Sequence, residues 1–536
     1  MPIPSHRSQA DAASPRRRAL LQWLASGAAA ASWPQRAWSQ PRFDSNPFAL
    51  GVASGSPTHQ GVVLWTRLMQ TGLFGRNTLP AEPIAVRWEV AHDEAFARIV
   101  RKGNTLALPE LAHSVHAEVD DLDADRWYFY RFRAGEAQSP VGRTRTLPAP
   151  DAAAQRLRLA YASCQRWEHG HYGAYHHMRE ESLDLVLFLG DYIYEYAGAV
   201  NAVRATGTWA TTLDTYRDRY ALHKSDPALQ AMHAHCPWLV TWDDHEVQND
   251  YAGLHPGDNG PPVADFAARR AAAYQAYYEH MPLRARVLTQ GLAGMAQGAE
   301  MRIYAQHDFG RLARIVMLDD RQYRSPQACN PDGRSGSSRI AVNQCPALAE
   351  PDRDMLGQDQ ERWLQAALSE SPGHWNLIGQ QTLLGTRNFG TPSQAAVWND
   401  GWDGYPAART RLTRLLERLP TRNNVVLGGD VHENWVGHVK ADYAQPDSAT
   451  VGVEFCGTSI TSRSGGGSKT ADYLARNPHF VFADSQRKGY GVLEITPQRL
   501  TATLRVVDDV TRADTGVQTL ARFEVESGKP ALQRTL

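Results

Sequence analysis

Short apolar runs alternate with polar turns in the first part of the chain. Four of these runs have the character of strands, and clusters of Gly, Pro and Asp separate them: residues 61–68, 84–90, 114–119 and 126–135. Strands at such spacing indicate a small antiparallel sandwich. We therefore expect an N-terminal β-sandwich of the immunoglobulin or fibronectin type over residues 42–150. A linker rich in Pro and Ala, Thr146 to Gln155, follows it.

After the linker, strand-like runs alternate with helical ones, which predicts βαβ units. In Leu183–Leu189 six of seven residues are apolar, as in a central strand covered on both faces. The expected strands are 157–164, 183–191, 237–246, 311–323, 375–384, 423–434, 449–462, 490–498 and 499–509. The expected helices are 172–181, 213–222, 263–281 and 358–369. Residues 156–536 thus predict an α/β fold, a layered β-sheet core flanked by helices.

The first 39 residues have the pattern of an export signal. Arg16, Arg17 and Arg18 precede a short alanine-rich apolar stretch, and small residues at Ala37 and Ser39 suit cleavage. Arg17 to Leu21 is similar to a twin-arginine signal, so we expect the twin-arginine export machinery as a partner and a periplasmic or secreted protein. The alternative is a basic helix or membrane anchor, but the apolar stretch is shorter than the roughly 20 residues of a span. We expect no membrane span in the mature form.

Charge and cysteine content narrow the function. The chain has 56 Lys+Arg and 57 Asp+Glu, and no block of like charge gives electrostatic support for specific nucleic-acid binding. Removal of residues 1–39 takes away five Arg and one Asp and leaves a net charge of -5. In an oxidising compartment thiols pair, and Cys329 and Cys345 bracket a polar, Gly/Ser-rich loop that a disulfide would close. Cys236 and Cys456 fit buried thiols, whereas Cys164 has no such simple explanation.

Chemically active residues follow four of the expected strands. These segments are Ala162–Cys164, Gly190–Tyr194, Trp242–Asp250 and Gly429–Asn434. Parallel strands of one sheet point their carboxyl ends the same way, so the four ends should converge where open α/β sheets bind ligands. Each segment alone also fits a turn, a helix cap or a solvated pair of acids. The prediction of a ligand site therefore depends on the convergence of all four strand ends.

Such a cluster holds a thiol, a phenol, imidazoles and several carboxylates. Clustered acids raise one another's pKa unless cations neutralise them, so we expect metal ions. A thiolate and a phenolate favour a trivalent or borderline ion, and carboxylates with amide oxygens suit calcium or magnesium. Asp191 and Tyr194 can reach one ion from a single turn. Asp430 and His432 point to one side if their strand continues, and only one of the adjacent acids Asp243 and Asp244 should ligate readily.

The motifs "ASCQ", "LGDYIYEY", "DDHEV" and "GGDVHEN", in this order over nearly the whole chain, resemble the PhoD-like alkaline phosphatase family of calcineurin-like metallophosphoesterases. The resemblance implies Fe³⁺ at Cys164, Asp191, Tyr194 and His432. It implies Ca²⁺ at Asp191, Asp244 and Asp430, with Asn249 as a weaker ligand and room for a second calcium. His245 is similar to the histidine that assists the leaving group. Arg269 and Arg270, on the helix after "DDHE", are candidates to grip phosphate oxygens, although half of such arginines are structural.

The resemblance implies an exported hydrolase of phosphoric mono- and diesters that uses a metal-activated hydroxide. If the protein is an enzyme, the alternative activity is that of a calcium-dependent phosphodiesterase or a phospholipase D-like enzyme. Outside enzymes, the alternative is a metal-stabilised binding protein whose coordination leaves no open position for water.

Overall fold

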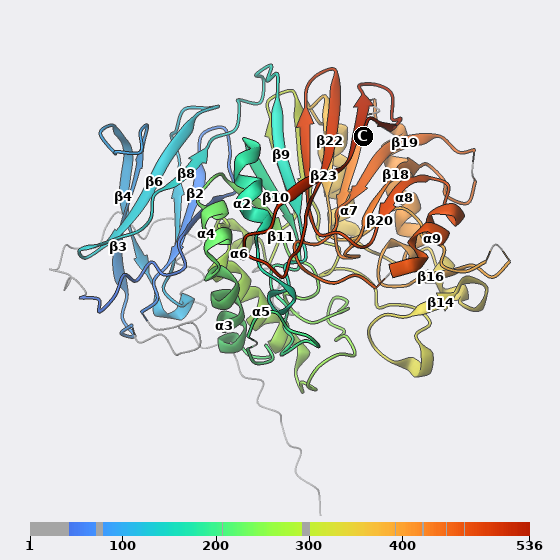
Figure 1. The fold of residues 1–536 in the computed structure, drawn as a ribbon, viewed down its shortest axis with the longest axis horizontal. Coiled ribbons are helices and arrows are strands. Elements are labelled where there is room, and N and C mark those ends of the chain that lie inside the picture. The colour runs from blue at the N-terminus through green and yellow to red at the C-terminus, as the bar shows by residue number, and fades with distance from the viewer. Residues whose placement is uncertain are drawn as a thin grey trace, which may run out of the picture.

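The computed structural model describes residues 42–70, 79–205, 207–291, 301–391, 393–420, 423–445, 447–465 and 467–536. The expected export signal lies outside these residues. The described part is a mixed α/β fold with a β-rich region at one end (Figure 1). None of its helices combines the length and apolar character that crossing a membrane requires.

Two sheets pack face to face at the centre. The larger sheet has ten strands in the order β24 (Gln533–Arg534), β23 (Val517–Glu526), β22 (Arg499–Val507), β21 (Gly489–Ile495), β9 (Leu157–Ala162), β10 (Leu185–Leu189), β11 (Trp238–Thr241), β1 (Val52–Gly55), β2 (Val62–Arg67) and β5 (Ser114–Val119). The smaller has seven, β12 (Ala305–Phe309), β13 (Ala313–Met317), β15 (Trp375–Gly379), β17 (Asn424–Gly428), β19 (Thr450–Cys456), β18 (Asn434–Lys440) and β20 (Phe480–Asp484).

Alternating side chains of the central strands pack into two different hydrophobic cores. Leu185, Leu187 and Leu189 of β10 point between the sheets, where they join residues of the seven-stranded sheet such as Leu377. Phe188 points the other way, into the core under the helices. This explains why nearly every residue of the strand is apolar, and it confirms the predicted strand buried on both faces.

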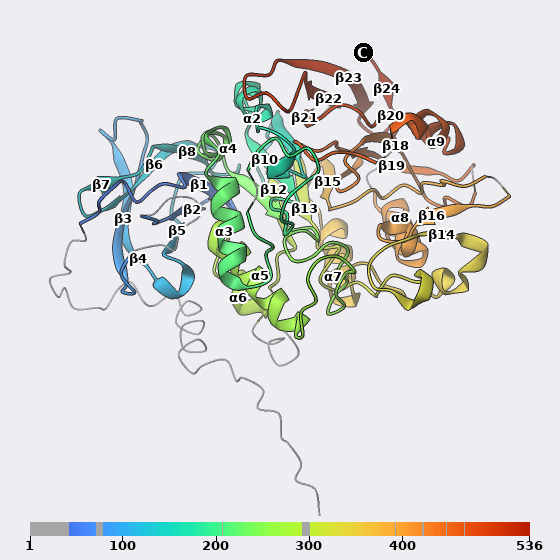
Figure 2. The same ribbon diagram turned by 60° about the horizontal axis from the view of Figure 1, so that its bottom comes forward.

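Helices cover the outer faces of both sheets (Figures 1 and 2). The ten-stranded sheet carries α2 (Ala174–Met178), α3 (Leu213–Lys224), α4 (Pro227–His233), α5 (Phe266–His280) and α6 (Arg286–Gly291) on its side. The seven-stranded sheet carries α7 (Gln358–Ser369) and α8 (Pro406–Arg418), and α9 (Thr470–Arg476) lies beside β20. Side-chain caps set two of the starts: Asp265 accepts from Ala268 N before α5, and Thr212 forms a capping box before α3.

The N-terminal region is a sandwich, as predicted. Its outer sheet consists of β4 (Ile99–Ala107), β3 (Ile84–Ala91), β6 (Trp127–Ala134), β7 (Ala137–Gln138) and β8 (Gly142–Arg145). Tyr130 and Phe132 of β6 point inward and share a core with Val62 and Leu64 of β2. The inner sheet, β1–β2–β5, is continuous with the ten-stranded sheet because Gly55 of β1 pairs with Trp238 of β11.

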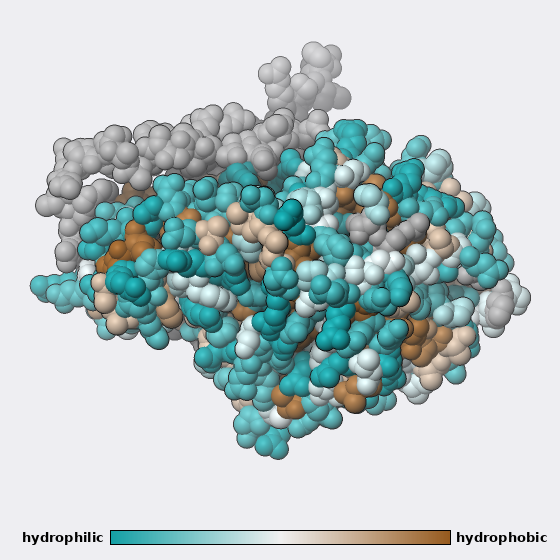
Figure 3. Space-filling model, turned by 90° about the horizontal axis from the view of Figure 1, so that it is seen from above, coloured by the Kyte–Doolittle hydropathy of each residue, from teal (hydrophilic) through white to brown (hydrophobic). Residues whose placement is uncertain are grey.

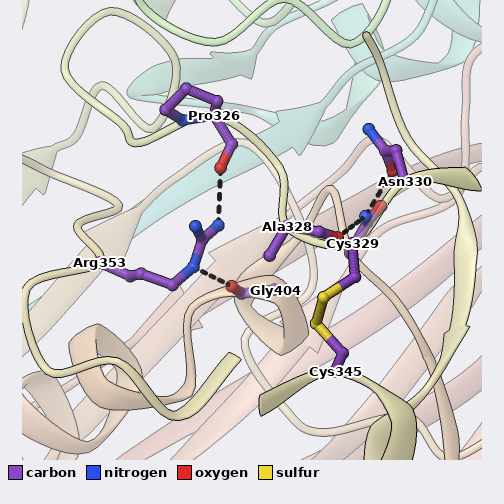
Figure 4. The surroundings of a disulfide bond; sticks show 8 residues. Pro326, Ala328, Cys329, Asn330, Cys345, Arg353 and Gly404 are labelled. Atoms are coloured by element: carbon purple, nitrogen blue, oxygen red, sulfur yellow. Dashed lines mark hydrogen bonds between the residues drawn. A yellow bond between two sulfur atoms is a disulfide. The ribbon is translucent and has the colours of Figure 1, made fainter. Parts of the chain in front are cut away.

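Seen from above, the molecule is mainly hydrophilic, with small separate hydrophobic areas (Figure 3). The predicted Cys329–Cys345 disulfide is present (Figure 4), and Cys236 and Cys456 are buried free thiols as expected.

Candidate metal centre

The chemically active residues follow strands of both central sheets. We expected all four strand ends in one sheet, and this was wrong for one of them. β9, β10 and β11 are parallel neighbours in the ten-stranded sheet, but β17 lies in the seven-stranded sheet. The ends still meet, because the ligand atoms of Cys164, Asp191 and His432 all lie within 4.8 Å of one another.

Glycines at the strand ends allow this close approach. A Cβ at Gly190 would lie 2.4 Å from Asp243 Cβ, and a Cβ at Gly429 would lie 2.4 Å from Ser163 Oγ. Real Cβ atoms do not come this close to other heavy atoms, so side chains here would force the strand ends apart. Gly190 also has a φ of 105°, a conformation that favours glycine. The buried strand therefore ends on Gly-Asp because the next strand end presses against it.

Four of the predicted ligands adopt the left-handed backbone conformation. The φ angles are 61° at Cys164, 57° at Asp191, 63° at Asp430 and 58° at His432. Such angles are uncommon outside glycine, and clusters of them occur at functional sites. β17 ends at Gly428, so the strand that we expected to continue through Asp430 and His432 does not do so. Tight turns bring these two side chains to the centre instead.

The first donor cluster consists of Cys164, Asp191 and His432, and Tyr194 joins it. The Tyr194 hydroxyl donates to Asp191 Oδ2 at 2.8 Å and lies 3.0 Å from His432 Nε2. His432 Nδ1 lies 2.8 Å from the carbonyl oxygen of Arg463, which fits a tautomer that leaves Nε2 free to ligate. These are the four residues that the sequence predicted for one ion.

The burial and the pKa values of these donor groups suit a strongly charged cation. Burial, with Asp191 nearby, raises the pKa of the Cys164 thiol and of the Tyr194 phenol well above their usual values. Asp191 Oδ1 is buried and has no hydrogen-bond partner among the described residues. A cation would satisfy this oxygen and would ionise the thiol and phenol beside it. The residues therefore fit a metal ion.

Further acidic clusters adjoin the first. Asp191 also groups with Asp244 and His245, Asp244 groups with Asp243 and Asp430, and a last cluster consists of Asp244, Asp250 and Asp400. In each, the ligand atoms lie within 4.8 Å of one another. Asp191 and Asp244 are thus shared between clusters, an arrangement in which one carboxylate can bridge two ions.

The acids of these clusters are held against strong mutual repulsion. Burial and neighbouring carboxylates raise the pKa of Asp243, Asp250 and Asp430, and that of Asp244 to about 6, although Arg321 opposes these shifts. Asp191 differs: burial opposes its ionisation, but His245, His432 and Tyr194 lower its pKa to about 2.

Arg321 is the cation that the sequence reading did not identify. Its side chain is fully buried, its Nε donates to Asp243 Oδ1, and its Nη1 donates to Asp400 Oδ2 at 2.6 Å. Nη2 lies 3.7 Å from Asp244 Oδ1 and 3.8 Å from Asp430 Oδ1. Arg321 thus binds one oxygen of Asp243, and Asp243 Oδ2 has no hydrogen-bond partner among the described residues. The signal was an arginine directly after two acids at the end of an expected strand.

His245 has a partner that fixes its orientation. Its Nδ1 lies 2.8 Å from Glu195 Oε2, and Glu195 Oε1 accepts from Asn249 N at 2.7 Å. Burial opposes a charge on His245, but Asp191, Glu195 and Asp244 raise its pKa well above the usual value. The imidazole is thus held in one orientation beside the acidic clusters.

The other predicted site residues have different surroundings. Arg269 donates to the Tyr216 hydroxyl at 2.8 Å and to the carbonyl oxygen of Ala210 at 3.0 Å. Arg270 donates to the carbonyl oxygen of Gly253 at 2.9 Å. Both arginines are buried, and these hydrogen bonds hold loops against α5. Asn249 Oδ1 accepts from the Tyr196 hydroxyl at 2.6 Å.

The chain is similar to known proteins over most of its length. The model of the PhoD-like phosphatase family matches residues 159–504, and that of the PhoD-like phosphatase N-terminal domain matches residues 32–148. Alkaline phosphatase D of Bacillus subtilis (strain 168) is 45% identical over 504 residues, which cover 92% of this chain and 83% of that protein. A solved structure described as the structure of PhoD has 43% identity and a TM-score of 0.85, covering 92% of this chain and 93% of its own. The chain belongs to the PhoD-like phosphatase family, as its strand-end motifs predicted.

Proposed function

We propose that this chain is an exported, metal-dependent hydrolase of phosphoric mono- and diesters with a mixed iron and calcium centre. Its family is that of the PhoD-like phosphatases, and its relative in Bacillus subtilis is named an alkaline phosphatase. The observation that carries the proposal is the position of Asp191. This buried carboxylate belongs both to the cluster with a thiol and an imidazole and to the cluster with Asp244.

The chemistry of the donors supports a different ion on each side of Asp191. Cys164, Tyr194 and His432 supply sulfur, phenol oxygen and nitrogen, which suit Fe³⁺. Asp244 and Asp430 supply hard oxygens, which suit Ca²⁺. Asp244, Asp250 and Asp400 also lie close together, but Arg321 and Arg324 donate to both oxygens of Asp400, so we assign no second calcium ion there. Bound there, the ions would supply Lewis-acid stabilisation of phosphate oxygens and a water of lowered pKa as the nucleophile.

The chain's own side chains would position the carboxylates and protonate the leaving group. Arg321 holds Asp243 and Asp400 in place through hydrogen bonds, and the Thr382 hydroxyl donates to Asp430 Oδ2 at 2.7 Å. His245, held through Nδ1 by Glu195, would give the proton on Nε2 to the oxygen of the departing alcohol. The hydrogen bonds of Arg269 and Arg270 to the protein favour a structural role for both, so we assign them no phosphate contact.

The export part of the proposal has support from the sequence alone, through the arginine cluster Arg16–Arg18 and the apolar stretch after it. Export would deliver the chain to a compartment where the Cys329–Cys345 disulfide is stable. Fractionation of cells that produce the full chain tests this part, and activity confined to the cytoplasm would contradict it.

A comparison of ester substrates tests the catalytic proposal. The chain should hydrolyse a phosphomonoester and a phosphodiester at alkaline pH, and the ratio of the two rates gives the preferred class. Asp191→Asn should reduce both rates by at least about a thousandfold, since it removes the shared carboxylate. Asp472→Asn, at an exposed acid of α9, should change neither rate. Full activity of Asp191→Asn would contradict the proposal.

A further inference from the structure

A cavity with an arginine-rich wall lies where α6 meets strands of both central sheets. It has a volume of about 230 Å³. Its wall contains residues of β11 from the ten-stranded sheet, of β12 and β13 from the seven-stranded sheet, of the start of α6, and of α7. None of the metal donors described above lines it. The cavity is therefore separate from the metal centre.

Three arginines from two segments of the chain line this cavity. Arg284 and Arg286 lie at the start of α6, and Arg302 lies shortly before β12. Among the described residues of the wall there is no Asp or Glu. Burial, with Arg284 and Arg302 nearby, lowers the pKa of Arg286. Because the three like charges surround one space whose wall supplies no acid, a bound anion would relieve their repulsion.

The guanidinium group of Arg284 is only partly satisfied by the protein. Its Nη1 lies 3.1 Å from Glu118 Oε2 and 3.6 Å from Asp120 Oδ1, and its Nε donates to the carbonyl oxygen of Ser56 at 3.4 Å. Its Nη2 is buried and has no hydrogen-bond partner among the described residues. A buried charged donor without an acceptor costs stability, and a bound ion or water usually supplies the missing acceptor.

Arg302 is held in place by aromatic rings and not by an acid. Its guanidinium carbon lies 4.4 Å from the centre of the Tyr304 ring, and that ring lies 4.9 Å from the ring of Trp363 on α7, centre to centre. Both rings line the cavity. Within the described part of the chain, the Arg302 side chain has no hydrogen bond and no ion pair. Stacking fixes the plane of the guanidinium and leaves its nitrogens free to donate to an anion.

His307 adds a hydrogen-bond acceptor to the wall of the cavity. Its Nδ1 lies 3.2 Å from the carbonyl oxygen of Pro57, so this nitrogen carries the ring proton. Burial, with Arg286 and Arg284 nearby, lowers the pKa of His307 to about 4. The neutral ring has an acceptor at Nε2, which suits the hydroxyl of a hydrogen phosphate ion and has no counterpart on a carboxylate.

We propose that this cavity binds a phosphate group at Arg284, Arg286 and Arg302, either as inorganic phosphate or as the phosphate of a small ester. Guanidinium groups match phosphate oxygens through paired hydrogen bonds, and a phosphate brings close to two negative charges at neutral pH. The cavity is smaller than the roughly 300–1,000 Å³ of sites for drug-sized ligands, so it suits a small anion. The site uses no metal ion and goes beyond the proposed hydrolysis.

Phosphate binding to the full, metal-loaded chain tests the proposal. Bound inorganic phosphate per chain is measured by equilibrium dialysis at about 0.15 M NaCl, where attraction to exposed charges is largely screened. We expect two phosphates, one at the metal centre and one in the cavity. Arg302→Gln should weaken the cavity phosphate by about 10- to 100-fold, the effect of lost charge-assisted hydrogen bonds, and leave hydrolysis unchanged. Arg311→Gln, at an exposed arginine outside the cavity, is the matched control and should bind both phosphates.

Two further variants separate the cavity from the metal centre. Arg286→Gln should weaken the cavity phosphate as Arg302→Gln does, whereas Asp191→Asn should lose the phosphate at the metal centre and keep the one in the cavity. In Asp191→Asn, which should not hydrolyse esters, competition by glycerol phosphate shows whether the cavity also takes esters or takes inorganic phosphate alone. Equal phosphate binding in wild type and Arg302→Gln, or loss of both phosphates in Asp191→Asn, would overturn the inference. A cavity phosphate without one at the metal centre would contradict the proposed metal centre instead.

Discussion

His245 is the residue whose proposed role is most specific. Its Nδ1 is engaged by Glu195, so Nε2 is the atom available for proton transfer. Replacing it by Gln should lower kcat for an alkyl phosphate by about 10²- to 10⁴-fold, because the leaving alkoxide needs a proton.

For a nitrophenyl phosphate the loss should be much smaller, since nitrophenolate leaves without protonation. The measurement is kcat for both substrates, with metal content as a check on the centre. Equal losses for the two substrates would contradict proton donation by His245.

For single residues, the sequence predicted which donor side chains lie together, but it did not predict the buried arginine and acid beside them. Cys164, Asp191, Tyr194 and His432 each follow a recognisable strand, and their ligand atoms do gather. Arg321 follows two acids in the loop after β13 and Asp400 lies in a loop before α8, and their contacts depend on packing between distant segments. A fully buried arginine is not visible in a sequence, because arginine is usually exposed.

Among the elements, the strand ends leave the least room for an added side-chain atom. Gly190→Ala would place a Cβ 2.4 Å from that of Asp243, in a backbone conformation that alanine rarely adopts. We expect a loss of about 1–3 kcal/mol in the free energy of unfolding and a clear loss of bound metal.

Gly198→Ala is the matched control, because Gly198 has a φ of 79° but no atom within 4 Å of the added Cβ. It should cost about 1 kcal/mol or less and leave metal content unchanged. Denaturant unfolding and metal analysis of both variants give the comparison. Metal content that is the same in both variants would contradict the close packing of strand ends.

The predicted elements agree with the structure where the apolar pattern is strong. The helix expected over 358–369 is α7, Gln358–Ser369, and the one expected over 263–281 contains α5, Phe266–His280. The strand expected over 423–434 ends at Gly428 as β17, and the next strand, β18, begins only at Asn434; β17 and β18 lie on either side of β19 and run in opposite directions. The turn between them contains Asp430 and His432. The apolar pattern does not reveal this reversal of the chain, because the strands before and after the turn are both largely buried.

At the scale of the whole molecule, the junction of sandwich and helices contains a buried lysine. Lys224 of α3 is 1% exposed, with its Nζ 4.2 Å from the centre of the Trp65 ring of β2. Burial lowers its pKa to about 7 from the model-peptide value of 10.5. Between these pH values the unfolded chain binds more protons than the folded one, so the free energy of unfolding should rise with pH.

Lys224→Met should remove this dependence. Relative to wild type the variant should be more stable near pH 7, by an amount on the order of a few kcal/mol, and the difference should shrink toward pH 10. Lys102→Met, at an exposed lysine, serves as the control. Unfolding curves with saturating metals between pH 7 and 10 test the slope. A difference that grows with pH would contradict the effect of burial.

The whole account depends on donors from two sheets sharing metal ions at Asp191. Elemental analysis of the protein purified after natural export tests this most directly. We predict iron together with calcium in wild type, and loss of both in Asp191→Asn while the variant remains folded. Wild-type protein that contains zinc alone, or that keeps its iron and calcium after Asp191→Asn, would contradict it.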